Sequence, residues 1–171
     1  SLGRTSATGD GVAIAVREAL KLKGINPEGA AVAIQGFGKV GYWAAVALES
    51  MGLKVVAVSD VNGGVTGFKK VSDLQRFTQD NGTIVGAPGT DSITNTELLH
   101  LPVDVLVPAA LADAITESTA SGIKAKIVVE GANAPTTPGS WQTRVESSFL
   151  TLNGFRTSKI IFGALMRSKR I

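Results

Sequence analysis

The chain has 171 residues, of which 44% are hydrophobic, 18% are charged and none is cysteine, so it suits one globular domain and excludes a disulfide scaffold or a disordered chain. The formal net charge of +3 is uneven, because residues 1–138 carry a net −2 and residues 139–171 carry a net +5. Residues 1–138 have no excess of positive charge, which argues against a nucleic-acid partner. The sequence has no apolar run of roughly 18 residues, which argues against a membrane partner.

The N-terminal part of the chain predicts a loop followed by a helix. Residues 1–11 are small and polar, and we expect them to form a flexible loop. Residues 12–23 place apolar side chains at near-helical spacing, and Gly24 ends this predicted helix. Residues 26–29 then form a turn that leads into the first strand.

The stretch from residue 30 to residue 60 carries the strongest pattern in the chain. An apolar run at 30–35 predicts a strand, and a G-x-G-x-x-G turn follows it and opens a helix that ends near Met51. A second apolar run at 53–59 predicts the next strand, which ends at Asp60. This order of strand, glycine turn, helix, strand and acid is the layout of a dinucleotide-binding βαβ unit.

Each glycine of this turn has a physical reason to be there. Gly36 permits the tight turn, Gly38 lets the backbone approach a pyrophosphate, and Gly41 lets the helix pack closely on the strand. Asp60 follows Gly41 by 19 residues, close to the roughly 20 expected for an acid that binds ribose. The alternative is an α/β crossover whose glycines only turn a corner, since 20 of the 171 residues are glycine.

The rest of the chain continues the alternation of strands and helices. The predicted elements are a hairpin-like segment at 64–68, a helix at 71–79, a loop at 80–91, a helical turn at 96–99, a strand at 103–107, a helix at 116–121 and a strand at 126–129. Such alternation implies right-handed crossovers. We therefore predict a doubly wound, mostly parallel α/β sheet of the Rossmann-like kind.

Three stretches should meet at one edge of this sheet. Ligands bind outside the carboxyl ends of parallel strands, where the glycine turn, residues 108–110 and residues 131–133 would all lie. The small residues there would let a flat ring lie against the backbone, and Asn133 offers both a donor and an acceptor. Asn133 could equally be a turn residue that tolerates a left-handed conformation.

Taken together, these stretches resemble the nucleotide-binding domain of the glutamate/leucine/phenylalanine/valine dehydrogenase family, most closely the C-terminal NAD(P)-binding domain of its glutamate branch. The similarity runs nearly unbroken over residues 1–138. The matching motifs are residues 1–9, 35–41, 58–60, 104–111 with 114–116, and 128–138.

The resemblance implies that the chain is the cofactor-binding part of an amino-acid dehydrogenase, with glutamate the expected substrate. Such an enzyme deaminates an amino acid oxidatively to a 2-oxo acid and ammonia. The resemblance places Thr8 near the nicotinamide carboxamide and Asn133 at the nicotinamide ribose or amide. All residues that it assigns to the cofactor are Thr8, Gly36, Phe37, Gly38, Lys39, Val40, Gly41, Asp60, Ala109, Ala110 and Asn133.

We expect NAD as the cofactor, with NADP as the alternative. Asp60 would repel a 2′-phosphate, whereas Lys69 and Lys70 could recognise one if they are more than solvated turn charges. Lys39 stands where many glutamate dehydrogenases have asparagine, and this leaves the branch of the family open. The residues at 136–138 lean toward the glutamate branch.

The departures from the family limit the expected activity. The family's catalytic lysine and aspartate belong to a separate substrate domain, so we assign no catalytic residue here. His100, the only histidine, has no second ligand nearby in sequence and predicts no metal site. The alternative function is therefore a non-catalytic nucleotide-binding fragment that lacks the substrate domain.

The segment at 139–171 departs from the family pattern. It is basic and rich in serine and threonine, and we expect an atypical tail that does not pack on the dinucleotide-binding domain at 1–138. For the complete enzyme the resemblance implies a homo-oligomer. The lack of cysteine and of a visible signal peptide leads us to expect a cytoplasmic location.

Overall fold

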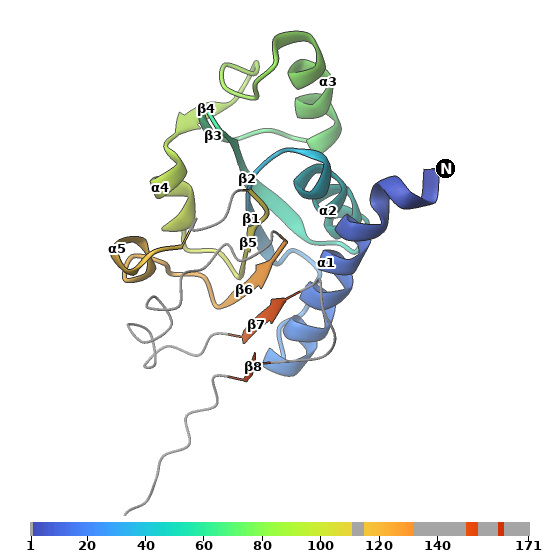
Figure 1. Ribbon diagram of the computed structural model, residues 1–171, viewed down its shortest axis with the longest axis vertical. Helices are drawn as coiled ribbons and strands as arrows, with labels where there is room; N and C mark the ends of the chain where they lie inside the picture. The colour runs from blue at the N-terminus through green and yellow to red at the C-terminus, as the bar shows by residue number, and fades with distance from the viewer. Residues whose placement is uncertain (1, 111–114, 132–149, 154–160, 163–171) are drawn as a thin grey trace, which may run out of the picture.

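The computed structural model describes residues 2–110, 115–131, 150–153 and 161–162 of the chain. These residues form a sheet with helices on both of its faces (Figure 1). The strands are β1 (Ala31–Gln35), β2 (Lys54–Asp60), β3 (Gly63–Thr66), β4 (Asp91–Ile93), β5 (Val105–Pro108), β6 (Ile127–Glu130), β7 (Leu150–Asn153) and β8 (Ile161–Phe162). The helices are α1 (Leu2–Lys23), α2 (Lys39–Ser50), α3 (Val71–Asn81), α4 (Asn95–Leu99) and α5 (Glu117–Ala120).

The order of the strands is β4-β3-β2-β1-β5-β6-β7-β8. The pairs from β2 through β1, β5 and β6 to β7 are parallel, whereas β3, β4 and β8 join by antiparallel pairs. From β1 the chain first moves to β2 on one side and later returns to β5 on the other side. The predicted doubly wound, mostly parallel α/β sheet is therefore confirmed, and β1 lies at its topological switch point.

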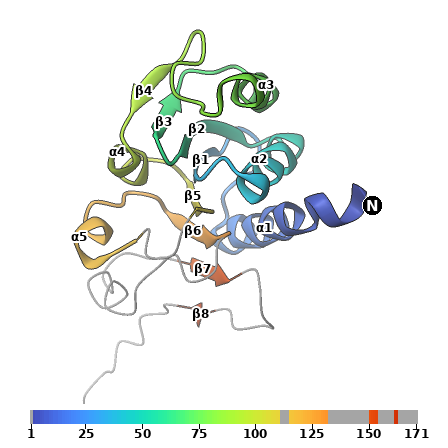
Figure 2. The same ribbon diagram turned by 45° about the horizontal axis from the view of Figure 1, so that its top comes forward.

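Helices lie over both faces of the sheet (Figure 2), and a layer of buried apolar side chains packs between the sheet and the helices on each face. The larger layer packs α1, α2 and α3 against one face, and the smaller layer packs α4 and the residues around α5 against the other. Successive residues of a strand point to opposite faces, so Ile34 joins the larger core and Ala33 joins the smaller one. Such strands, buried on both faces, explain the continuous apolar runs in the sequence.

Helix α1 begins ten residues earlier than the sequence predicts. The loop expected at residues 1–11 is wrong, because α1 starts at Leu2 and crosses α2 near Gly9. A Cβ atom at Gly9 would lie 2.6 Å from backbone atoms of Trp43 and Ala44. Packing between the two helices thus outweighs the low helix propensity of glycine, which is about 1 kcal/mol per residue.

The segment between β2 and α4 holds more structure than its turn residues predict. Helix α3 continues to Asn81, and Gly82 ends it in a left-handed conformation with φ +74°. A loop at 82–90 then leads into β4, a short edge strand that we did not predict. Its three residues are exposed or half-buried, so the sequence carries no apolar alternation there.

Most of the predicted tail lies outside the described residues. The expectation that the tail does not pack on the domain is wrong for its two described parts, because β7 pairs with β6 in the parallel register, with Val128 opposite Thr151, and β8 pairs with β7. The boundary predicted at residue 138 stays a prediction.

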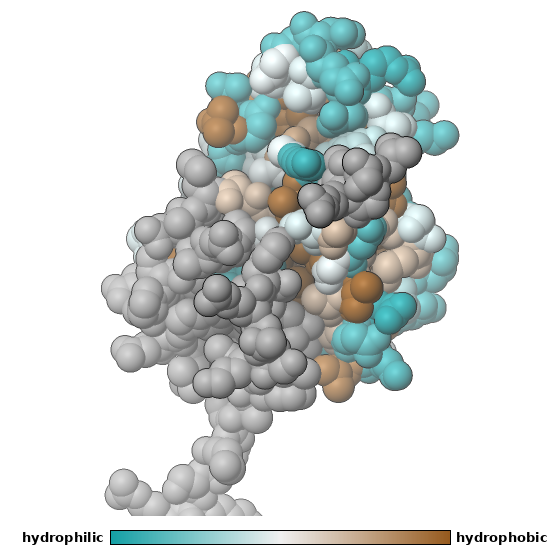
Figure 3. All heavy atoms as spheres, turned by 45° about the vertical axis from the view of Figure 1, so that its right-hand side comes forward, coloured by the Kyte–Doolittle hydropathy of each residue, from teal (hydrophilic) through white to brown (hydrophobic). Residues whose placement is uncertain are grey.

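Large apolar side chains of the described residues are mostly buried. Those that are exposed are Ile14, Leu22 and Val61. On the face shown in Figure 3, hydrophilic residues gather at the end that carries α3, and the hydrophobic patches are small and separate. Within the described part of the chain, no helix has the length and hydropathy needed to cross a membrane.

Candidate dinucleotide site

The carboxyl ends of four parallel strands are joined by backbone hydrogen bonds. The N–H of Gly36 donates to the carbonyl of Ser59 at 2.9 Å, which joins the end of β1 to β2. The N–H of Ala109 donates to Gln35 at 2.7 Å, and that of Gly131 donates to Pro108 at 2.9 Å. The glycine turn, residues 109–110 and Gly131 therefore lie side by side at one edge, as the sequence predicts.

Backbone conformation and close packing within the protein require two glycines of the turn, Gly36 and Gly41. Gly36 has φ +100°, a left-handed conformation that side chains disfavour. A Cβ atom on Gly36 would also lie 2.8 Å from the backbone nitrogen of Ala110. A Cβ atom on Gly41 would collide with the carbonyl oxygen of Gly36. Both glycines thus serve the close packing of the turn against α2 and the end of β5.

Neither backbone conformation nor packing within the protein requires a glycine at position 38. Its φ of −78° and ψ of −165° are extended values open to any residue. A Cβ atom placed there would meet no atom within 4 Å. A side chain at Gly38 would instead occupy the space outside the N-terminus of α2.

The N-terminus of α2 has the features that favour binding of an anion. Gly38 is its N-cap and provides no side-chain hydrogen bond, and the first turn contains no acidic residue. The first N–H groups of a helix have no partner within it, and the macrodipole places partial positive charge there. Lys39, the first residue of α2, is exposed and adds a positive charge.

The other residues predicted from the turn differ in exposure. Phe37 is 5% exposed and packs in the larger core, with its ring 5.9 Å from the ring of Tyr42. Its side chain is therefore a core residue, and only its backbone can face the edge. Val40 is half-buried and packs against the same core.

Asp60 ends β2 at the same edge, and its carboxylate accepts three hydrogen bonds. Oδ1 accepts the backbone N–H of Asn62 at 2.7 Å. Oδ2 accepts the Thr83 hydroxyl at 2.7 Å and the Ile84 N–H at 2.8 Å. In addition, the Asn95 side chain donates to the Asp60 carbonyl at 3.0 Å. Sequence reasoning missed these partners, because Thr83 lies 23 residues away in an irregular loop.

The remaining predicted residues are distributed over three segments. Ala109 is half-buried and Ala110 is exposed at the end of β5, so both leave the edge uncrowded. Thr8 is half-buried in α1, one turn before Val12, which packs close to Gly131. Asn133 lies outside the described residues.

Two buried polar side chains beneath the edge have no hydrogen-bond partner. They are Gln35 at its Oε1 atom and Ser59 at its Oγ atom, which face each other across β1 and β2. Both lie on the same face of the sheet as Ala33, opposite α2. Unpaired buried polar groups are rare in native proteins and often mark a functional site or a bound water. Sequence reasoning did not single out either residue.

The His100 side chain packs against the residues around α5. It is half-buried, and its Nε2 atom lies 3.0 Å from the Thr119 carbonyl oxygen. Its imidazole fills the space where a Cβ atom of Gly122 would lie. Among the described residues, no group of three histidine, cysteine, aspartate or glutamate side chains could hold a metal ion.

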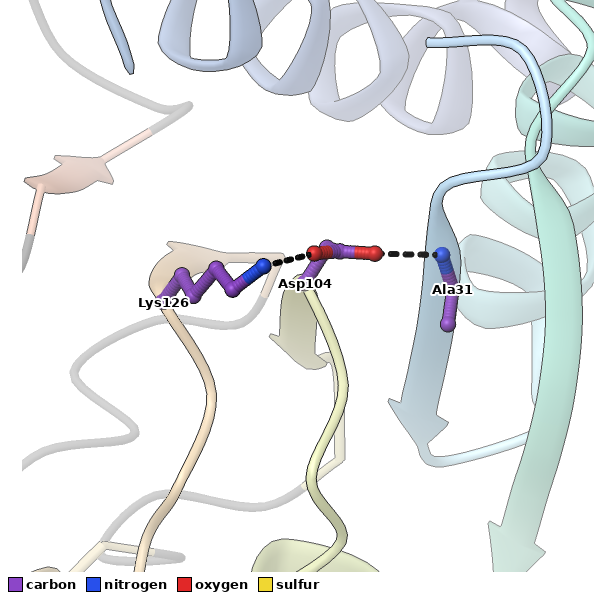
Figure 4. A network of polar contacts seen from close by, with 3 residues as sticks. All are labelled: Ala31, Asp104 and Lys126. Carbon is purple, nitrogen blue, oxygen red and sulfur yellow. Dashed lines mark hydrogen bonds and ion pairs between the residues drawn. The ribbon is translucent and has the colours of Figure 1, made fainter. Parts of the chain in front are cut away.

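A different polar network holds the opposite, amino edge of the sheet (Figure 4). Asp104, just before β5, accepts the Ala31 N–H at 2.9 Å and the Lys126 ammonium at 2.7 Å. Burial opposes ionisation of Asp104, but Lys126 and the Ala31 N–H outweigh it and hold the pKa of the carboxyl below its ordinary value. This network joins β1, β5 and β6 and lies away from the glycine turn.

The reversal of strand order at β1 and the glycine turn at its carboxyl end define the class of protein, a doubly wound α/β protein of the Rossmann-like kind. The chain belongs to the Glutamate/Leucine/Phenylalanine/Valine dehydrogenase family, whose model matches residues 1–158. The match extends beyond residue 138, where the sequence motifs of the resemblance end.

Two curated relatives illustrate the similarity. The chain is 52% identical to glutamate dehydrogenase of Thermotoga maritima over 142 residues, which are 81% of this chain and 34% of that protein. It is 46% identical over 138 residues to the cryptic catabolic NAD-specific glutamate dehydrogenase GudB of Bacillus subtilis, covering 80% of this chain and 32% of that protein. The chain thus spans about a third of the length of these relatives.

Solved structures support the same fold. The hetero-hexameric glutamate dehydrogenase of Thermus thermophilus in its Leu bound form superposes with a TM-score of 0.81 at 28% identity, covering 90% of this chain and 36% of that chain. Glutamate dehydrogenase from Peptoniphilus asaccharolyticus gives a TM-score of 0.68 at 34% identity, covering 87% of this chain and 35% of that chain.

Proposed function

We propose that the chain is the dinucleotide-binding part of an amino-acid dehydrogenase, with glutamate as the amino acid. Gly38 carries the proposal, because this glycine is needed neither for backbone conformation nor for packing and is the exposed N-cap of α2. A pyrophosphate approaching the backbone is a direct physical reason for a glycine at that place. Membership in the family and relatives named glutamate dehydrogenases support the choice of substrate.

The residues at the carboxyl edge fit a dinucleotide. The backbone from Gly36 to Gly41 would hold the pyrophosphate at the N-terminus of α2. Asp60 would accept a hydrogen bond from the adenosine ribose, and Ala109 with Ala110 would border the nicotinamide half. Thr8 and Asn133 would contact the nicotinamide end. Such a cofactor supplies hydride transfer, and the protein's contribution is to bind and orient it.

NAD is the cofactor that we propose, rather than NADP. The Asp60 carboxylate lies at the end of β2, where a 2′-phosphate would bring two negative charges together. The relative from Bacillus subtilis, 46% identical, is named as NAD-specific. The proposal is confined to cofactor binding, because the chain covers about a third of the relatives' length. We also predict that the chain alone shows no turnover, that the complete enzyme is a homo-oligomer and that its location is cytoplasmic.

A titration with NADH and NADPH, followed by nicotinamide fluorescence, tests this function. We expect NADH to bind more tightly than NADPH, and Gly38→Val to abolish binding while the circular dichroism spectrum stays unchanged. Ser50→Val, at the exposed C-terminal end of the same helix, is the control and should bind as the unaltered chain does. A folded chain that binds neither nucleotide would contradict the proposal.

A further inference from the structure

The loop between α3 and β4 is attached to the carboxyl edge through Asp60. A simple βαβ unit would lead from β2 directly into a crossover helix, but here β3, α3 and β4 intervene. The loop between α3 and β4, in the middle of this inserted segment, returns to the end of β2, where Thr83 and Ile84 donate to one carboxylate oxygen of Asp60 at 2.7 and 2.8 Å. The inserted segment therefore forms part of the same edge as the glycine turn.

The attachment has a second point of contact. A Cβ atom at Gly63 would lie 3.4 Å from Cγ2 of Val85, so this loop also packs on the start of β3. The Thr83 oxygen in turn accepts the Val85 N–H at 3.2 Å. Residues 83–85 thus contact both Asp60, before the turn that follows β2, and Gly63, after that turn. This turn lies beside the place where the adenosine end of a dinucleotide would bind.

On the basis of the proposed function, we propose that residues 83–85 form the outer wall of the adenosine subsite and that Thr83 is a positioning residue for Asp60. A carboxylate offers about four acceptor sites, and three donors from Asn62, Thr83 and Ile84 already engage it. Asp60 then has room for one ribose hydroxyl, held in a single orientation. The fixed carboxylate favours a 2′-hydroxyl over a 2′-phosphate.

The test removes the Thr83 hydroxyl while keeping the volume of the side chain. We expect Thr83→Val to raise the Kd for NADH by about five- to tenfold, as for one lost hydrogen bond near a charged group, and to lower the preference for NADH over NADPH. Binding of reduced nicotinamide mononucleotide, which has no adenosine, should stay unchanged. Thr83→Ser restores the hydroxyl and should restore both the affinity and the preference.

Thr90→Val is the matched control. Thr90 belongs to the same loop, and its hydroxyl donates to the Ala87 carbonyl at 2.7 Å instead of to Asp60. It should leave both nucleotide affinities unchanged, and Thr83→Ala replaces Thr83→Val if that variant does not fold. Unchanged NADH binding in the Thr83 variants, or an equal loss for the mononucleotide, would overturn the positioning role. Failure of the unaltered chain to bind NADH would instead overturn the proposed function.

Discussion

Replacing Asp104 with alanine should destabilise the fold without weakening cofactor binding. The substitution removes the acceptor of the Ala31 N–H, which is a hydrogen bond to a charged group worth about 1.5–3 kcal/mol. It also removes the pair with Lys126, whose side chain is 63% exposed, so that this pair adds no more than about 1 kcal/mol. We therefore expect Asp104→Ala to lower the free energy of unfolding by about 1.5–4 kcal/mol, and Lys126→Ala to lower it by less than about 1 kcal/mol.

Thermal unfolding followed by circular dichroism measures this loss. For a chain of this size each kcal/mol lowers Tm by about 2–4 °C, so Asp104→Ala should lower Tm by about 3–16 °C. Asp80→Ala, at an exposed site near the end of α3, is the control and should leave Tm nearly unchanged. Because Asp104 lies at the amino edge, NADH affinity should be the same in both variants.

The loss should also depend on pH. The folded pKa of Asp104 is held below its ordinary value, so ionised Asp104 stabilises the fold above the unfolded pKa of about 3.9. This contribution is lost as the pH falls through the folded pKa, and the difference between the two chains should shrink there. Equal Tm values for Asp104→Ala and the unaltered chain at pH 7, or a Tm difference that stays constant into acid, would show that ionised Asp104 does not stabilise the fold.

Two other substitutions test the packing of α2. Gly41→Ala should destabilise the chain by more than about 2 kcal/mol in urea unfolding, because its methyl group collides with the Gly36 carbonyl; a variant as stable as the unaltered chain would show that the turn can move. Burial raises the pKa of Glu49, although the Val71 N–H and Lys70 oppose it, so its ionised form destabilises the fold above that pKa. Glu49→Gln should therefore be slightly more stable than the unaltered chain at pH 7 and no more stable near pH 4, and a loss of stability at pH 7 would contradict this assignment.

The sheet and its switch point could be predicted because their signals are local. The continuous apolar run at 30–35 is what a strand buried on both faces requires, and the glycines that follow it mark a turn into a helix. The same pattern of apolar run and small residues marks the end of β5. Since carboxyl ends of parallel strands share one edge, the meeting of these stretches followed from their order in the chain.

Features that rest on distant contacts could not be predicted. The helical state of residues 2–11 depends on the crossing of Gly9 over α2, and glycine in a sequence ordinarily favours a loop. The threefold bonding of Asp60 depends on Thr83 and Ile84, which lie in a segment whose composition indicates only irregular structure. For the same reason the unpaired Oε1 atom of Gln35 is visible only once its neighbours are in place.

An NADH titration followed by the backbone amide resonances in NMR tests directly whether the cofactor binds at the N-terminus of α2. We predict that the N–H signals of Lys39, Val40 and Gly41 shift most, because these groups would meet the pyrophosphate at the N-terminus of α2. The signals of Ala31 and Lys126, at the amino edge, should stay in place. Shifts centred on the amino edge, or no shift in the first turn of α2 at saturating NADH, would show that the N-terminus of α2 does not bind the pyrophosphate.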